Sequence, residues 1–228
     1  NASVPMSIII IILTSLVIGT ICGAINGFCI AKLKVPPFIA TMAMMNVARG
    51  LAYVFTDAKP VFGLPESFGF IGLKEIGIIP VCVILMVLII VLSYVILTKT
   101  CYGRYVYAVG SNKEVAKLTG INVDQVRFSV YVISGILSAL AGLVLASKLQ
   151  NGQATAGVGY ELNAIAAVAM GGTSMSGGRG GIPQTVIGLI VIGIINNALS
   201  LLGVSAYWQT VAMGVIILIA VVIDQVRK

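Results

Sequence analysis

The stretch Gly180–Ile223, GGIPQTVIGLIVIGIINNALSLLGVSAYWQTVAMGVIILIAVVI, runs for 44 residues without one charged side chain. A helix that crosses a membrane needs about 20 mainly apolar residues, so this stretch predicts two consecutive spans. Three further runs without charge, at residues 1–31, 76–98 and 128–147, continue the pattern over the chain. Charged residues make up 9% of the 228 residues, against about 25% in soluble proteins, which excludes an ordinary soluble domain.

Hydropathy and the positions of helix-breaking residues predict an all-α fold, a polytopic transmembrane helical bundle with about seven spans. The predicted spans are residues 8–31, 38–55, 78–98, 128–147, 161–177, 183–202 and 206–223. Small residues recur at every fourth position on the first and fourth spans, a spacing that favours close packing between membrane helices. These residues are Gly19, Gly23 and Gly27, and Ser134, Ser138 and Gly142.

The basic residues predict the orientation, because cytoplasmic segments carry an excess of Lys and Arg. The best arrangement places ten of the 14 basic residues inside: Lys32, Lys34, Lys99, Arg104, Lys113, Lys117, Arg127, Arg179, Arg227 and Lys228. Lys59, Lys74 and Lys148 lie outside, and Arg49 lies within the second span. This arrangement begins outside and ends inside. We therefore interpret residues 1–228 as one transmembrane domain that lacks its N-terminal spans, the C-terminal part of a roughly ten-span protein, and assign the net charge of +7 to orientation rather than to nucleic-acid binding.

Side chains suited to catalysis or metal binding are scarce. The chain has no histidine, and its four cysteines form no CxxC pair, so we predict no catalytic residue and no metal site. The stretch GGTSMSGGRGG, residues 171–181, has the glycines of a phosphate-binding loop, but no Lys-Ser or Lys-Thr follows and no strand is predicted before it. We interpret it as a tight turn between two packed helices and expect no cofactor bound by this chain.

Four polar residues lie within predicted spans and are candidates for lining a pathway. Asn46 and Arg49 are one helical turn apart on the second span, and Asn196 and Asn197 interrupt the long apolar run. Each pair also has a structural interpretation: Arg49 extends to the outer surface as an anchor, and the amides bond across helices.

The most charged part of the chain, residues 99–127, is predicted to be a cytoplasmic segment with a short helix of its own, at about residues 111–120. Ser111 and Glu114 match the capping box that begins a helix. Gly120 supplies the left-handed residue that ends one, with Ile121 folding back. Two interpretations stay open: an amphipathic helix lying in the headgroups, or a knob that docks a cytoplasmic partner.

Several long segments, in order along the chain, resemble one family. GRYVYAVGSNKEVAKLTGI, GYELNAIAAVAMGGTSMSGGRG and NNALSLLGVSAYWQ are similar to signature segments of the permease subunits of bacterial ABC importers for monosaccharides, the ribose, xylose and galactose type. VPPFIATMAMMNVARGLAYVFTDAKPV fits the same family. The family's N-terminal segment, which contains a DLSVGS-like sequence, has no counterpart here, in agreement with the expected upstream spans.

The resemblance implies a non-enzymatic permease subunit in the bacterial cytoplasmic (inner) membrane, with ribose as the first choice of sugar. The expected partners are an ABC ATPase subunit that binds ATP and Mg²⁺, a periplasmic or lipid-anchored sugar-binding protein and a second permease copy. The family's coupling helix, which sits in a groove of the ATPase subunit, falls on Ser111, Asn112, Glu114, Val115, Leu118 and Gly120. Because 171–181 is a family signature, Gly177 and Gly178 are candidates for a gating or hinge role.

The alternative is a stand-alone ion-coupled sugar carrier or channel. No series of carboxylates within the spans is present to relay protons, which weighs against it. An intramembrane serine protease is a third interpretation, but no histidine and no lysine within a span is present to activate a serine.

Overall fold

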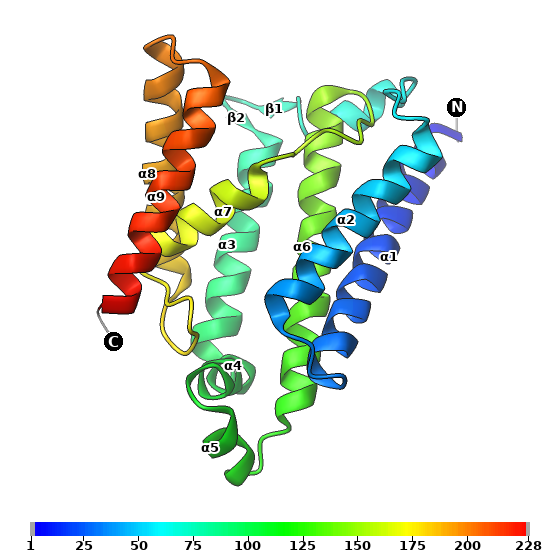
Figure 1. Cartoon of the computed structure of the whole chain (residues 1–228). Helices are drawn as coiled ribbons and strands as arrows, with labels where there is room; N and C mark the ends of the chain where they lie inside the picture. The colour runs from blue at the N-terminus through cyan, green and yellow to red at the C-terminus, as the bar shows by residue number, and fades with distance from the viewer. Residues whose placement is uncertain (1–2, 227–228) are drawn as a thin grey trace. The chain divides into compact units, whose positions relative to one another are not determined.

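The computed structural model describes residues 3–226, which form two compact units (Figure 1). The first unit contains residues up to Ile89 together with Asn122–Ala156, and the second contains Ile90–Ile121 and the chain from Gly157 onward. The helices of the first unit are α1 (Ser3–Ala31), α2 (Pro37–Thr56), the 3-10 helix η1 (Glu66–Phe70) and α6 (Val123–Leu149). A short hairpin, β1 (Glu75–Ile76) and β2 (Ile79–Pro80), leads into α3 (Val81–Lys99), which continues into the second unit. The remaining helices of the second unit are α4 (Cys101–Ser111), α5 (Lys113–Leu118), α7 (Tyr160–Met170), α8 (Ile182–Leu201) and α9 (Ala206–Val226).

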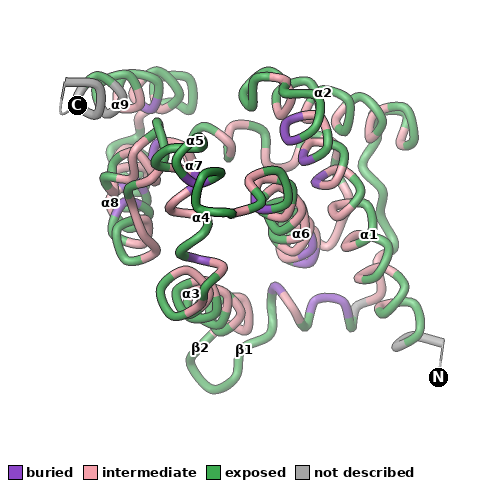
Figure 2. The backbone as a smooth tube through the Cα atoms, turned by 90° about the horizontal axis from the view of Figure 1, so that it is seen from below, coloured by how far each residue is buried: buried purple, intermediate pink, exposed green. Residues whose placement is uncertain are grey.

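The all-helical prediction is confirmed, and each predicted span overlaps a helix, though not always over its whole length. Among the described residues, five helices, α1, α2, α3, α6 and α8, are long and apolar enough to cross a membrane. Most of their large apolar side chains are exposed, and α3 buries none of its residues (Figure 2). Such extensive exposed apolar surface is typical of a protein that contacts lipid.

The prediction for residues 161–177 is wrong in its second half. The helix in this region, α7, has 11 residues and ends at Met170. At 1.5 Å per residue α7 is about 16 Å long, roughly half the hydrocarbon thickness of a bilayer, so it does not cross alone. The helix ends there because Gly171 and Gly172 open a turn, in which Gly172 has a φ of +82°.

The glycine ridge of α1 packs directly on α6, as its spacing predicts. A Cβ on Gly23 would lie 2.5 Å from the carbonyl oxygen of Tyr131, and one on Gly19 would lie 2.5 Å from that of Gly135. The two backbones are therefore in contact, which is how membrane helices gain van der Waals energy without a hydrophobic driving force. The stripe Ser134–Ser138–Gly142 takes no part in this seam, because it lies on an exposed face of α6.

In the second unit, α7 packs between α8 and α9. The buried cluster contains Ala166 and Ala167 of α7, Ile192 of α8 and Met213 of α9. Gly188 of α8 lies against the backbone of Ala167, where no side chain would fit.

A buried serine joins the end of α6 to η1 in the first unit. The Ser147 hydroxyl donates a hydrogen bond to the Phe68 carbonyl at 2.6 Å and accepts one from the Gly72 amide at 2.8 Å. Its side chain is 0% exposed. Nearby, Val61 and Gly152 exchange backbone hydrogen bonds of 2.8 and 2.9 Å, so two loops are tied at this end of the unit.

Replacing Ser147 by alanine is expected to destabilise the protein by about 1–3 kcal/mol, because a buried donor and a buried acceptor lose their partner. The measurement is the midpoint of thermal unfolding of the purified protein in detergent. Ser138→Ala is the matched control on the same helix, since Ser138 is exposed and bonds only to its own helix at Ser134. Equal midpoints for the two variants would refute a role for Ser147 in joining these elements.

Candidate functional site

The predicted coupling segment forms two helices rather than one. Ser111 is the last residue of α4, and the N-cap of α5 is Asn112, whose side-chain oxygen accepts hydrogen bonds from the amides of Glu114 and Val115 at 3.0 and 3.2 Å. The predicted Ser111–Glu114 capping box is therefore wrong by one position. Ser111 continues the preceding helix, and Asn112 is the residue that takes the extended conformation of a cap.

The C-terminal end of α5 agrees with the prediction. Gly120 has a φ of +82°, and the Ile121 amide donates to the Ala116 carbonyl at 3.1 Å, the pattern of a left-handed helix end. Both ends of the short helix are therefore capped by residues of the segment itself.

The two faces of α5 differ sharply. Ala116 is 2% exposed, whereas Val115 is 54% and Leu118 is 87% exposed. Glu114 and Lys117 are also exposed. A six-residue helix thus presents two apolar side chains, bordered by charges, on its outer face. This is the composition of a surface that binds a protein groove or a membrane interface.

The glycine-rich turn of residues 171–181 contacts the end of α4. A Cβ on Gly178 would lie 2.6 Å from Ser111 Cα, and the Tyr107 hydroxyl donates to the Gly180 carbonyl at 3.0 Å. The sequence predicted neither contact, because Tyr107 and Gly180 are 73 residues apart and the patterns considered were local.

Within the turn, the side-chain hydroxyls differ in their hydrogen bonding. Ser174 Oγ accepts from the Ser176 amide at 3.3 Å. The hydroxyl oxygen of Thr173 is buried without a hydrogen-bond partner in the described part of the chain.

The four candidate pathway residues fall in different units. Asn46 and Arg49 belong to α2 in the first unit, and the Asn46 amide bonds back to the Met42 carbonyl at 3.1 Å. Asn196 and Asn197 belong to α8 in the second unit, with Asn196 half-buried and Asn197 exposed.

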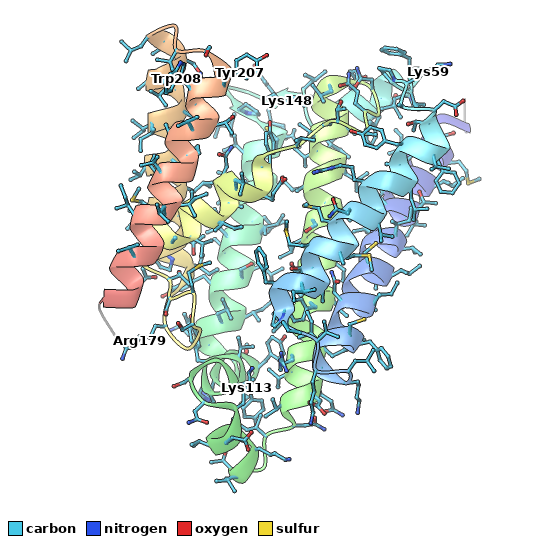
Figure 3. All side chains as sticks on the ribbon, in the orientation of Figure 1. Lys59, Lys113, Lys148, Arg179, Tyr207 and Trp208 are labelled. Atoms are coloured by element: carbon cyan, nitrogen blue, oxygen red, sulfur yellow. The ribbon has the colours of Figure 1, made fainter. Side chains whose placement is uncertain are left out.

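Charged and aromatic side chains separate along the second unit. Lys113 and Arg179 lie at one end of it, and Tyr207 and Trp208 lie at the opposite end (Figure 3). Tyr207 and Trp208 are exposed, as expected of aromatic residues at a membrane–water interface. In the first unit, Lys59 and Lys148 share one end. Both observations agree with the predicted orientation.

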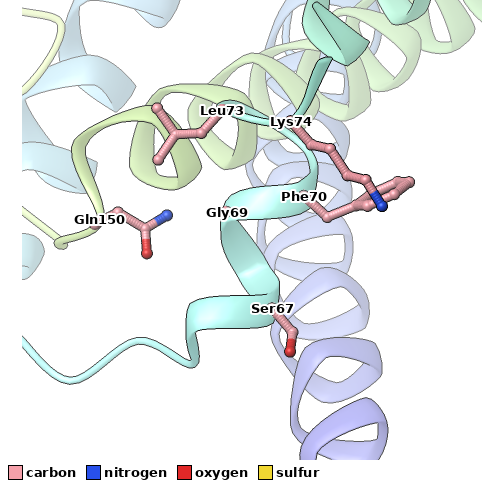
Figure 4. Close-up of a pocket in the computed structure, with 6 residues that line it drawn as sticks. All are labelled: Ser67, Gly69, Phe70, Leu73, Lys74 and Gln150. Carbon is pink, nitrogen blue, oxygen red and sulfur yellow. The ribbon is translucent and has the colours of Figure 1, made fainter. Parts of the chain in front are cut away.

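An open hollow of about 530 Å³ lies in the first unit, lined by Ser67, Gly69, Phe70, Leu73, Lys74 and Gln150. The Lys74 ammonium lies 4.8 Å from the centre of the Phe70 ring, and Gln150 approaches from the other side (Figure 4). None of the candidate site residues lines this hollow. Among residues 3–226, no group of three or more His, Cys, Asp or Glu side chains is placed to hold a metal ion.

Comparison with known proteins identifies the kind of protein. Residues 1–221 match the family described as "Branched-chain amino acid transport system / permease component". The chain belongs to this permease family. The permease is 50% identical to the ribose import permease protein RbsC of Bacillus subtilis over 205 residues, which are 89% of this chain and 64% of the relative. It is 40% identical to RbsC of Escherichia coli over 229 residues, 99% of this chain and 71% of the relative.

A third relative carries a different sugar in its name. The L-arabinose transport system permease protein AraH of Escherichia coli is 39% identical over 235 residues, covering 100% of this chain and 72% of the relative. No solved structure gave a significant match. The matches span about two thirds of each relative's length. The named relatives are permease proteins of transport systems and not enzymes, and the permease is accordingly a multi-pass protein of the inner membrane.

Proposed function

We propose that this permease forms the membrane passage of a binding-protein-dependent importer of monosaccharides, with ribose as the expected sugar. The observation that carries the proposal is the 40–50% identity to ribose import permeases over most of the chain. ATP and Mg²⁺ would be bound and ATP hydrolysed in a separate ATPase subunit, since this chain has no phosphate-binding lysine motif. A sugar-binding protein and a second permease copy complete the proposed assembly.

The coupling segment is the proposed contact with the ATPase subunit. Of the proposed coupling residues, Ser111 ends α4, and Asn112, Glu114, Val115, Leu118 and Gly120 cap, form or terminate α5, which presents its apolar outer face away from Ala116. The fixed ends of α5 support this proposal, because a rigid knob transmits displacement whereas a loop absorbs it. The alternative, in which α5 lies among lipid headgroups, places the same side chains against the membrane.

We further propose that the chain crosses the membrane seven times. The five long helices and α9, whose 21 residues extend about 31 Å, would make six crossings. The fifth crossing would combine α7 with the non-helical residues 150–159 before it. Lys148 and Arg179, on either side of this crossing, would then lie outside and inside as the basic-residue distribution requires.

Asn46, Arg49, Asn196 and Asn197 remain the proposed polar contacts of the sugar path. Support for this role comes from their position on otherwise apolar helices, where amides and guanidinium groups are rare and often functional. A sugar delivered by a binding protein needs only weak contacts in the membrane, so few polar residues suffice.

The proposal is tested with the full-length permease, its ATPase subunit and its binding protein. Replacing residues 112–118 by a Gly/Ser linker of equal length is expected to abolish ATPase co-purification in detergent and ATP-dependent ribose uptake into proteoliposomes. The detergent measurement separates the two interpretations of α5, because a helix that only lies in headgroups contributes nothing to ATPase binding without a bilayer.

A control variant carries Ile78→Ser beside Gly77 at the tip of the β1–β2 hairpin, which alters an exposed loop of the other unit. This variant is expected to retain ATPase binding. ATPase binding and uptake by the linker variant at the level of the unaltered protein would refute the coupling assignment. Uptake by the unaltered protein that follows a proton gradient without ATP would refute the importer itself.

A further inference from the structure

We propose that Tyr107 is a positioning residue that fastens the α4–α5 corner to the glycine-rich turn 171–181, so that displacement of α5 is passed to α7 and α8. This inference rests on the proposed coupling role of α5. In this role the turn has a mechanical function, which the Tyr107–Gly180 hydrogen bond maintains.

The first observation is a contact between two backbones. A Cβ on Gly110 would lie 2.8 Å from the Gly178 nitrogen, and one on Gly178 would lie 2.6 Å from Ser111 Cα. Gly178 also has a φ of +75°, a conformation that L side chains rarely adopt. The turn and the end of α4 therefore meet without intervening side chains, and neither moves toward the other without a clash.

The second observation is the hydrogen bond that prevents separation. The half-buried Tyr107 hydroxyl donates to the Gly180 carbonyl at 3.0 Å. Tyr107 lies three and four residues before Gly110 and Ser111, so its side chain is on the same face of α4 as the backbone contact. The end of α4 and the turn are thus held together by close backbone packing and by a hydrogen bond.

The third observation is that the turn is anchored to the helices on its two sides. The Ser174 amide donates to the Arg179 carbonyl at 3.0 Å, which closes the turn on itself, and the Thr173 amide donates to Val168 of α7 at 3.2 Å. The Thr185 hydroxyl of α8 donates to the Gly181 carbonyl at 3.0 Å. An 11-residue connection closed in this way follows its anchor rather than flexing independently.

On the other side, α5 is tied to α4. The Asn112 amide donates to the Ala108 carbonyl of α4 at 3.1 Å, while the Asn112 side chain caps α5. A continuous set of hydrogen bonds therefore leads from α5 through α4 and Tyr107 to α7 and α8.

The experiment compares Tyr107→Phe with Tyr105→Phe, a matched control at a 45% exposed tyrosine of the same helix. In the full-length permease reconstituted with its ATPase and binding protein, Tyr107→Phe is expected to lower the amount of sugar transported per ATP by about threefold to tenfold. ATPase co-purification and the ATPase rate are expected to stay unchanged, and the Tyr105→Phe control to match the unaltered protein. Gly178→Ala should likewise slow transport without abolishing assembly.

Amide hydrogen exchange of the permease alone tests the contact between α4 and the turn 171–181 in the absence of the ATPase and the binding protein. Tyr107→Phe is expected to raise exchange at the amides of residues 171–181, and the control is not. Unchanged exchange, or an unchanged transport ratio alongside normal ATP-driven uptake, would overturn the role of Tyr107. Absence of ATP-driven uptake in the unaltered complex would refute the proposed function, and with it the transmission role.

Discussion

Gly188→Val is expected to prevent the normal packing of α7 against α8 and to cost about 3 kcal/mol or more of stability. A Cβ at this position would overlap the carbonyl oxygen of Ala167 and lie 2.7 Å from the Gly171 nitrogen. Because these neighbours are backbone atoms, no change of side-chain rotamer relieves the clash, and the helices must separate. The measurement is the yield of monodisperse protein after detergent extraction, together with the midpoint of thermal unfolding.

Gly193→Val on the same helix is the matched control. It adds the same side chain to α8, but the added Cβ meets no atom within 4 Å in the described structure. We expect a normal yield from this variant. Equal yields from Gly188→Val and Gly193→Val would show that α7 and α8 do not approach as closely as the structure has them.

The helices of this permease could be predicted from sequence because their signal is long and continuous. Runs of about 20 apolar residues have few alternatives to a membrane helix. The bounds of α2 and α8 lie within a few residues of the predicted ones, and α1 ends where predicted but begins about one turn earlier. The predicted span was longer than α7 because uncharged residues continue beyond Met170, and only the glycines mark the end of the helix. Composition alone does not distinguish a short helix followed by a tight turn from a glycine-containing span.

The coupling segment shows how local signals mislead by small amounts. Ser111 and Asn112 are both good N-cap residues, and a Glu three positions after Ser111 favoured the wrong one. The choice depends on α4, an amphipathic helix that begins at Cys101 and includes Ser111. Only one short helix, at about residues 111–120, was predicted in this segment, so Ser111 was not assigned to a preceding helix.

The contacts that join distant segments had no sequence signal. Ser147 is one serine near the end of a span, and its partners at Phe68 and Gly72 are more than 70 residues away. The Tyr107–Gly180 bond is of the same kind. Patterns of period 3.6 and capping motifs report neighbours on one helix, whereas these contacts follow from how helices pack.

Gly23→Leu is the second variant with a large expected effect, because it acts on the seam of α1 and α6. The new Cβ would lie 2.5 Å from the Tyr131 carbonyl oxygen and 3.0 Å from Val132 Cα. We expect α1 to move away from α6, with a loss of about 3 kcal/mol or more of stability. The measurement is thermal unfolding in detergent, with disulfide cross-linking between cysteines introduced on α1 and α6 as a report of their contact.

Gly142→Leu separates this effect from a general intolerance of leucine at membrane glycines. Gly142 lies on α6, yet a Cβ there meets no atom within 4 Å among the described residues. Both glycines belong to small-residue stripes of the same spacing, so sequence alone predicts similar sensitivity for the two. The structure instead predicts that only Gly23→Leu lowers the unfolding midpoint and the α1–α6 cross-link. If Gly142→Leu lost the cross-link to the same extent, the seam would have to include the face of α6 that carries Ser134 and Ser138, and the assignment of Tyr131 and Gly135 to the contact would be wrong.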